Sequence, residues 1–165
     1  VKLWKNYEQA AKTAIRERRT VRQPRGIEFS FHDGCLFVKL PGGRKLCYWS
    51  ARVKEDPETG RESIRYMGVN QETKKWGETE TWGGKISENL CQSIARDCLA
   101  EAMLRVNAAG YDIVMHVHDE MIVDVPDERT DAAEEITRLM SIAPEWAPGL
   151  PLKGETYETE FYKKD

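Results

Sequence analysis

The sequence predicts an α+β protein in which a long helix packs on an antiparallel sheet, together with a β-hairpin that has an acidic tip and a preceding helix and β-meander. Three observations support this class. Apolar residues recur at helical spacing in two long segments, short extended segments lie between them, and two apolar strands flank Asp119 and Glu120. No internal repeat or linker divides the 165 residues. We therefore expect a single domain or domain fragment over 1–165, with the first helix and the meander in 1–81 and the other elements in 82–165.

The first helix is expected over residues 2–19. Leu3, Tyr7, Ala10 and Ala14 follow helical spacing, and basic residues gather at the C-terminal end, where the helix dipole favours cations. A three-stranded meander follows, because extended segments there are separated by turn-forming residues. The expected strands are residues 27–31, 35–40 and 44–49, and two weaker extended segments are residues 63–69 and 74–81.

A longer helix is expected over residues 87–109, with Ser87 as its N-cap and Gly110 as its stop, after a flexible loop at 82–85. Its broad apolar face includes Cys91 and Cys98, which we expect to be buried as small hydrophobic side chains. The elements expected after it are strands over 112–118 and 121–125, a helix over 128–142 and a last strand over 155–162.

Charge is distributed unevenly along the chain. The formal net charge is −3, but residues 1–54 carry 13 Lys and Arg against 4 Asp and Glu, whereas residues 55–165 carry 12 against 24. A basic segment suits contact with a polyanion such as nucleic acid, although a dipolar surface without a partner gives the same pattern. No apolar run approaches the ~20 residues of a membrane span. The four cysteines lack zinc-ligand spacing and no signal peptide precedes them, which indicates reduced thiols in the cytoplasm.

The acidic tip of the hairpin is the first candidate site. Asp119 and Glu120 are adjacent like charges in an expected two-residue turn, without the glycine that such turns favour, and they repel each other unless a cation holds them. Carboxylate oxygens are the ligands that Mg²⁺ binds, and the alternative is a solvated turn. A zinc site with His116 and His118 lacks a third ligand, so we expect His116 to pack or hydrogen-bond beneath a mostly buried hairpin.

Polar side chains on the long helix form the second candidate site. Glu88, Asn89, Gln92 and Arg96 share one helix face, and Lys85 lies beside the helix start. Amide and guanidinium groups near a metal-binding carboxylate suit contacts with nucleotide edges and phosphates. A solvated helix face is the alternative interpretation.

Two stretches of the sequence resemble a known family. Residues 83–103, GGKISENLCQSIARDCLAEAM, and residues 108–126, AAGYDIVMHVHDEMIVDVP, resemble the C-terminal palm of family A DNA polymerases, most closely the bacteriophage or prophage type. The tip formed by His118, Asp119 and Glu120 resembles the third polymerase motif of that family. The resemblance implies a partial polymerase palm and the activity of a DNA-directed DNA polymerase, a nucleotidyltransferase of DNA replication.

The resemblance also implies roles at the tip. Asp119 is then a catalytic carboxylate that coordinates Mg²⁺ in a two-metal site, Glu120 supports that site, and His118 lies near the primer terminus. One ion activates the primer 3′-hydroxyl, and the other steadies the triphosphate and the leaving pyrophosphate.

On the long helix, the resemblance places Gln92 at the minor groove of the primer–template, with Arg96 and Lys85 as candidates for backbone contact, while Glu88 stands where many relatives carry asparagine. The implied partners are a DNA primer–template, deoxynucleoside triphosphates and an upstream polymerase segment. That segment is needed because these 165 residues contain neither the family's first catalytic carboxylate motif nor its nucleotide-binding fingers helix.

Without those parts, the chain alone is expected to lack polymerase activity, because one aspartate and its neighbour cannot hold two ions and a triphosphate. The sequence opens at Val1 within an amphipathic pattern, which suggests a piece of a longer or split enzyme. Two other interpretations stay open. One is a non-catalytic nucleic-acid-binding or interaction module with a palm-like fold, and the other is a metal hydrolase that uses His116, His118 and Asp119.

Overall fold

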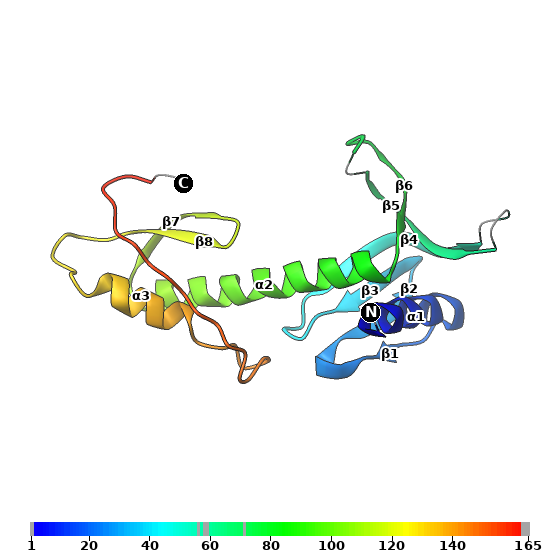
Figure 1. Ribbon diagram of the computed structural model, residues 1–165, viewed down its shortest axis with the longest axis horizontal. Helices are drawn as coiled ribbons and strands as arrows, with labels where there is room; N and C mark the ends of the chain where they lie inside the picture. Colours follow the sequence, from blue (N-terminus) through cyan, green and yellow to red (C-terminus); the bar gives the residue numbers. More distant parts are fainter. Residues whose placement is uncertain (1, 56, 58–59, 71, 163–165) are drawn as a thin grey trace. The chain divides into compact units, whose positions relative to one another are not determined.

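The computed structural model describes residues 2–55, 57, 60–70 and 72–162 and confirms the α+β class (Figure 1). The chain divides into two compact units, Val1–Ser93 and Ile94–Asp165. The long helix α2, Gly83–Ala108, begins in the first unit and ends in the second. None of the helices in the described ranges is both long enough and apolar enough to span a bilayer.

The first unit is built on a six-stranded antiparallel meander whose spatial order follows the chain order. The three expected strands and the two weaker extended segments belong to this one sheet, which also includes a short strand ahead of them. The strands are β1 (Val21–Arg22), β2 (Glu28–His32), β3 (Cys35–Lys39), β4 (Lys45–Glu55), β5 (Glu62–Val69) and β6 (Trp76–Thr81), with the short 3₁₀ helix η1 (Pro24–Gly26) between β1 and β2.

Helix α1, Lys2–Glu17, packs on this sheet. It buries Tyr7, whose ring lies 6.0 Å from the ring of Phe29 in β2. The helix ends two residues earlier than predicted, and Arg18, which follows it, has a φ of 50° that cannot continue a right-handed helix. Strands of the sheet bury Phe29, Leu36, Val38 and Ile64 completely, and Leu40, directly after β3, is also fully buried.

Helix α2 begins at Gly83, four residues before the predicted start, so the expected flexible loop is its first turn and Ser87 is not its N-cap. The cap comes from α1, because Glu8 Oε2 accepts a hydrogen bond from Gly83 N at 3.0 Å. The backbones of α1 and α2 approach closely there, and a Cβ on Gly83 would lie 2.2 Å from the carbonyl oxygen of Trp4. At the other end, Gly110 has a φ of 87° and confirms the predicted stop.

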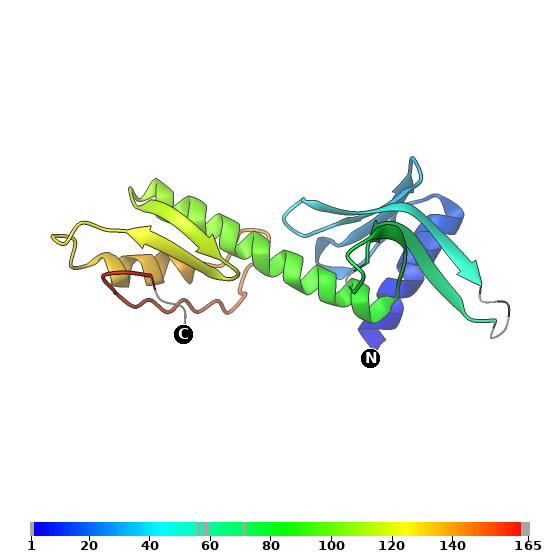
Figure 2. The ribbon, with the colours of Figure 1, turned by 90° about the horizontal axis from the view of Figure 1, so that it is seen from above.

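The second unit packs the end of α2 against a hairpin and a short helix (Figure 2). The hairpin consists of β7 (Asp112–Val117) and β8 (Glu120–Asp124), and the helix is α3 (Ala132–Met140), which is shorter than the predicted 128–142. The buried cluster of this unit is Val106, Tyr111, Ala132, Ile136 and Leu139, with Ile113, Met121, Val123, Val125 and Met140 packed against it.

Two further expectations were wrong. Residues 155–162 form no strand, because side chains anchor this region to α3 instead: Gly154 N donates to Ser141 Oγ at 3.0 Å, and the hydroxyls of Thr137 and Thr156 lie 2.6 Å apart. Cys98 is buried as expected, but Cys91 is exposed. All four cysteines are free thiols.

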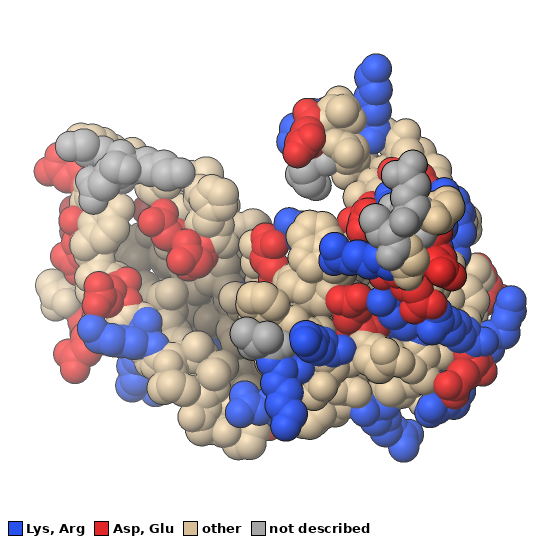
Figure 3. Space-filling model, turned by 45° about the vertical axis from the view of Figure 1, so that its right-hand side comes forward, with Lys and Arg blue, Asp and Glu red and all other residues tan. Residues whose placement is uncertain are grey.

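The charge asymmetry follows the two units. The first unit has 18 Lys and Arg against 12 Asp and Glu, and the second has 7 against 16. On the visible face of the first unit, at the right of Figure 3, basic and acidic side chains are interspersed. Many acidic side chains of the first unit therefore lie close enough to basic ones to be neutralised. The net charge of this unit is positive.

Candidate functional site

The tip of the β7–β8 hairpin is formed by His118 and Asp119, and Glu120 is the first residue of β8. The predicted turn of Asp119 with Glu120 was therefore wrong by one residue, since Glu120 pairs with Val117. His118 has a φ of 53°, in the left-handed region. Two-residue hairpin loops require a positive φ at their first central position, and histidine enters this region more readily than most side chains.

The hairpin is less buried than the sequence predicts. Ile113, Met121 and Val123 pack against the core cluster, but Val114 is 62% exposed, and the side chain of His116 is exposed instead of lying beneath the hairpin. A two-stranded hairpin has one covered face and one open face, so only part of its apolar side chains can be buried. At the tip, His118, Asp119 and Glu120 are all exposed.

The two carboxylates of the tip differ in their contacts. Tyr162 Oη donates a hydrogen bond to Glu120 Oε2 at 3.4 Å. Partial burial and the nearby Glu120 carboxylate raise the pKa of the Tyr162 phenol, which stays protonated as a donor at neutral pH. The Asp119 carboxylate has no hydrogen-bond or ion-pair partner among the described residues. Glu120 thus accepts one long hydrogen bond from the C-terminal segment, and the Asp119 carboxylate is open to a ligand.

The carboxylates at the tip are the type of ligand that Mg²⁺ prefers, but there are too few of them to form a complete site. Adjacent carboxylates supply the hard oxygen ligands that Mg²⁺ takes. Within residues 2–55, 57, 60–70 and 72–162, however, no three His, Cys, Asp or Glu side chains come together as a ligand group. The set of His116, His118 and Asp119 required for a metal hydrolase is therefore not formed, and further ligands for Asp119 and Glu120 would have to come from another source.

On α2, Lys85 and Gln92, the two predicted DNA-contacting side chains of the first unit, both contact Glu88. Lys85 Nζ lies 3.0 Å from Glu88 Oε2, and Gln92 Nε2 donates to Glu88 Oε1 at 3.3 Å. These three residues, exposed or half-buried, form what we call the α2 ridge. Asn89 does not belong to it, because Asn89 Nδ2 donates to Tyr48 Oη of β4 at 3.0 Å. Asn89 of the predicted polar face is therefore bonded to the sheet. The Glu88 carboxylate contacts the other two side chains, Lys85 and Gln92.

Arg96 follows Gln92 by four residues on α2 and lies in the second unit, where its side chain is exposed. The second unit also contains the hairpin tip. Each unit therefore presents part of the predicted site: Lys85 and Gln92 in the first, and Arg96 with His118, Asp119 and Glu120 in the second.

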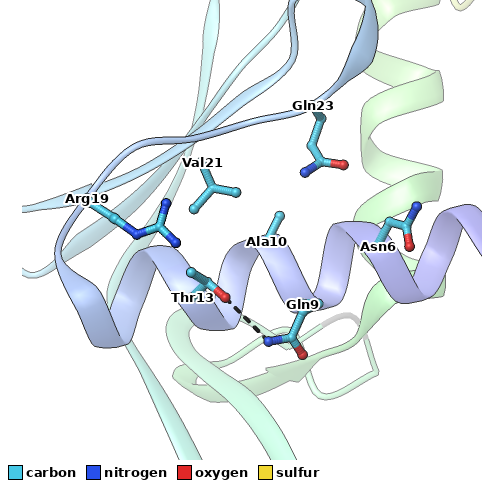
Figure 4. A pocket seen from close by; sticks show the side chains of 7 residues that line it. All are labelled: Asn6, Gln9, Ala10, Thr13, Arg19, Val21 and Gln23. Atoms are coloured by element: carbon cyan, nitrogen blue, oxygen red, sulfur yellow. Dashed lines mark hydrogen bonds between the residues drawn. The ribbon is translucent and has the colours of Figure 1, made fainter.

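A pocket of about 330 Å³ lies between α1 and the segment around β1, and the sequence did not predict it (Figure 4). Its lining is rich in amide side chains, and Gln9 Nε2 donates to Thr13 Oγ1 at 3.3 Å. The lining residues are Asn6, Gln9, Ala10, Thr13, Arg19, Val21 and Gln23. They include no carboxylate, imidazole or thiol, so this pocket offers hydrogen bonds but no acid, base or nucleophile beyond one threonine hydroxyl.

Comparison with known proteins gives one clear similarity. The chain is 42% identical over 165 residues, its whole length, to the DNA polymerase of Bacillus phage SP02, and it spans 25% of that protein. No family model matches the sequence, and no solved structure matches the fold. The expected relation to a phage DNA polymerase is therefore confirmed at the level of homology to one quarter of such an enzyme.

Proposed function

We propose that this chain, which is homologous to a quarter of a phage DNA polymerase, is the C-terminal palm part of a family A DNA-directed DNA polymerase. In this proposal it supplies a metal-binding carboxylate and contacts with the primer–template. The observation that carries the proposal is the exposed pair Asp119 and Glu120 at the hairpin tip, within a chain that is similar over its full length to a polymerase. The enzyme would act in the cytoplasm of a bacterial cell or a phage-infected host.

At the tip, Asp119 holds Mg²⁺ and Glu120 supports it from the first position of β8. Bound Mg²⁺ supplies positive charge that lowers the pKa of an attacking hydroxyl and stabilises a transferring phosphoryl group. Asp119 is exposed in the turn, and the Tyr162 hydroxyl donates a hydrogen bond to the Glu120 carboxylate. His118, beside Asp119 in the turn, is placed to contact the primer terminus.

On α2, Gln92 and Lys85 contact DNA, and Arg96 adds a backbone contact. An amide reads base edges in the minor groove, and ammonium and guanidinium groups bind phosphates. In the free chain Glu88 holds both Lys85 and Gln92. DNA binding therefore exchanges two internal contacts of the α2 ridge for contacts with the nucleic acid.

The proposal requires parts beyond these residues. A two-metal site needs carboxylates on both sides of the ions, and no group of three potential ligands exists in the described part of the chain. The remaining ligands and the nucleotide-binding groups would come from an upstream polymerase segment, the partner to which this chain contributes its hairpin and α2.

A chimeric enzyme tests this function. The quarter of the Bacillus phage SP02 DNA polymerase that matches this chain is replaced by the chain, and primer extension is measured with Mg²⁺. We expect the chimera to extend primers and Asp119→Asn to reduce the rate by at least about 100-fold. Asp127→Asn, at another exposed acid after β8, is the matched control and should leave the rate close to that of the chimera.

Two results would count against the proposal. One is a chimera in which Asp119→Asn extends primers as fast as the parent. The other is an inactive chimera whose DNA binding is tight and survives Asp119→Ala, which would favour the non-catalytic nucleic-acid-binding module instead.

A further inference from the structure

One side of the sheet formed by β4, β5 and β6 carries a row of large apolar side chains. The register pairs Trp49 of β4 with Met67 of β5, and Val69 of β5 with Trp76 of β6. Paired residues of antiparallel strands project to the same side, and so do residues two apart on one strand. These four side chains therefore share one surface, which we call the tryptophan face.

The opposite side of the same strands is the one that packs into the core. Ile64 and Thr81, which pair with each other, are 0% and 1% exposed. Tyr66, two residues after Ile64, meets Tyr48 with ring centroids 5.1 Å apart in an edge-to-face arrangement. The tryptophan face is therefore the outer side of these three strands.

The side chains of the tryptophan face are unusually open to solvent for their size. Trp76 is 63% exposed, Trp49 is 57% exposed and Val69 is 48% exposed, while Met67 is half-buried. Single exposed apolar residues are common on protein surfaces, but a contiguous apolar patch that includes two tryptophans indicates a binding surface.

The acids on this face are already neutralised. Glu78 contacts Arg52 and lies 3.8 Å from Lys54, and Glu80 lies 2.8 Å from Arg65. All five side chains belong to the same outer side of the three strands. The carboxylates therefore do not present an acidic surface, and the three bases against two acids leave a small positive excess.

The end of the hairpin adds two further cations. Lys74 and Lys75 immediately precede Trp76, are exposed, and form no ion pair with any carboxylate in the described part of the chain. Asn70 orders this turn, because its Oδ1 accepts from the N–H groups of Glu72 and Thr73 at 2.9 Å. In Figure 3 this end of the hairpin, at the top of the view, carries Lys or Arg side chains with Asp or Glu side chains beside them, and the same turn includes the exposed Glu72.

Aromatic rings beside unpaired cations are better suited to bind a single-stranded nucleic acid than to bind an apolar surface of another protein. Bases stack on aromatic side chains while ammonium groups bind the phosphates between them. Trp49 and Trp76 lie two strands apart across the sheet and two residues apart along it. Standard strand spacings therefore put their Cα atoms about 12 Å apart. A few nucleotides of single-stranded DNA can span this distance. The excess of bases over acids in the first unit, 18 against 12, agrees with this occupant.

We propose that the tryptophan face binds an unpaired stretch of a DNA strand, whose bases stack on Trp76 and Trp49 and whose phosphates contact Lys74 and Lys75. The choice of DNA as the strand rests on the proposed polymerase function. The stacking surface itself is separate from the hairpin tip and from the α2 ridge, and none of its residues belongs to either.

The test measures binding of the 165-residue chain to a fluorescein-labelled oligothymidylate of about 12 nucleotides, by anisotropy at low salt. Trp76→Ala should weaken binding about 5- to 100-fold, and Trp76→Phe should restore most of it, because a phenyl ring still stacks. The double variant Lys74→Gln with Lys75→Gln should lower the slope of log affinity against log salt by about 1 to 1.5. Trp4→Ala, at another tryptophan of the first unit that is 51% exposed, should bind like the parent chain.

Several results would overturn the inference: absence of oligothymidylate binding, equal binding by Trp76→Ala and the parent chain, or equal loss in Trp4→Ala. Concentration-dependent self-association that Trp76→Ala abolishes would assign the face to contacts between proteins instead. Thermal unfolding of each variant confirms that the exposed substitutions leave the fold intact. The chimera with Asp119→Asn separates this inference from the proposed function, because primer extension depends on the hairpin tip and oligothymidylate binding by the chain does not.

Discussion

The carboxylate of Glu8 in α1 accepts a hydrogen bond from the backbone N–H of Gly83 at 3.0 Å, so that a side chain of one helix caps the first turn of another. Glu8 also forms an ion pair with Lys12 at 2.7 Å, which orients the carboxylate. A negative charge at a helix N-terminus is favourable because the first N–H groups of a helix have no partner within it. This contact fixes where α2 begins, and α2 carries the candidate DNA contacts.

Removing this cap should destabilise the first unit. Glu8→Ala is expected to lower the free energy of unfolding by about 1–2 kcal/mol at neutral pH, since Gly83 N loses its acceptor. Glu8→Gln, which keeps an acceptor oxygen but not the charge, should cost less. Urea unfolding of the three proteins measures the difference, and equal stability of Glu8→Ala and the parent would contradict the capping role.

The same carboxylate should make stability depend on pH. Burial alone would raise the pKa of Glu8, but hydrogen bonds from Lys12 and Gly83 N and the nearby cations outweigh it and lower the pKa below its usual 4.5. A group with a lowered pKa in the folded protein stabilises it above the unfolded value, and this contribution is lost as pH falls through the folded value. The stability lost between about pH 5 and about pH 3 should therefore be smaller in Glu8→Gln than in the parent.

A methyl group at Gly83 should not be tolerated. Gly83→Ala places a Cβ at 2.2 Å from the carbonyl oxygen of Trp4 and 2.8 Å from its carbonyl carbon, both backbone atoms. We expect a loss of about 3 kcal/mol, although alanine is otherwise the better helix former. Gly77→Ala, where a Cβ meets nothing within 4 Å, is the control and should leave the unfolding midpoint almost unchanged.

Neutralising Glu88 should strengthen DNA binding if Lys85 and Gln92 are DNA contacts. Glu88→Gln releases Lys85 from its ion pair, so affinity for a primer–template duplex should rise about two- to fivefold, the range of an exposed ion pair. Glu134→Gln, at an exposed acid on α3, controls for the change in net charge. Fluorescence anisotropy is the measurement. If both variants gain the same affinity for DNA, the α2 ridge does not belong to the DNA-binding surface.

The 165-residue chain by itself should not extend primers. Mg²⁺-dependent nucleotidyl transfer needs more ligands than Asp119 and Glu120 supply, and the described residues contain no third ligand in reach. Gel analysis of a labelled primer after incubation with the chain, Mg²⁺ and the four nucleotides should show no added nucleotide. Extension that disappears in Asp119→Asn would refute this expectation and locate a complete active site within the chain.

Local patterns in the sequence predicted those parts of the fold that depend on neighbouring residues. Helical spacing identified α1, α2 and α3, and Gly110 ended α2 as its backbone freedom predicts. The start of α2 was wrong because its cap, Glu8, lies 75 positions earlier in the chain, and no pattern around Ser87 contains that information. The expected strand at 155–162 was wrong for a similar reason, since contacts from Gly154 and Thr156 to α3 are not visible in the segment itself.

At the candidate site, too, local patterns predicted some features, and contacts between distant residues determined others. The residue types of the tip were predictable, but the position of the turn depended on the left-handed backbone of His118, which a search for glycine turns overlooks. The binding of Lys85 and Gln92 by Glu88 could have been predicted, because the three residues follow i, i+3 and i, i+4 spacing on a helix. The tie between Asn89 and Tyr48 could not, because it joins the helix to a strand 41 positions away.

The left-handed backbone of His118 opposes the stability of the hairpin to the function proposed for this side chain. A side chain in this conformation costs about 1–2 kcal/mol that glycine avoids, and the greater freedom of glycine in the unfolded chain returns about 0.5–1 kcal/mol of that difference. A selection for thermal resistance alone should thus drift toward glycine at position 118 and lose the imidazole. If His118 contacts the primer terminus as proposed, a selection that demands nucleotidyl transfer should keep the histidine and the weaker hairpin, so the two selections would diverge at this one codon.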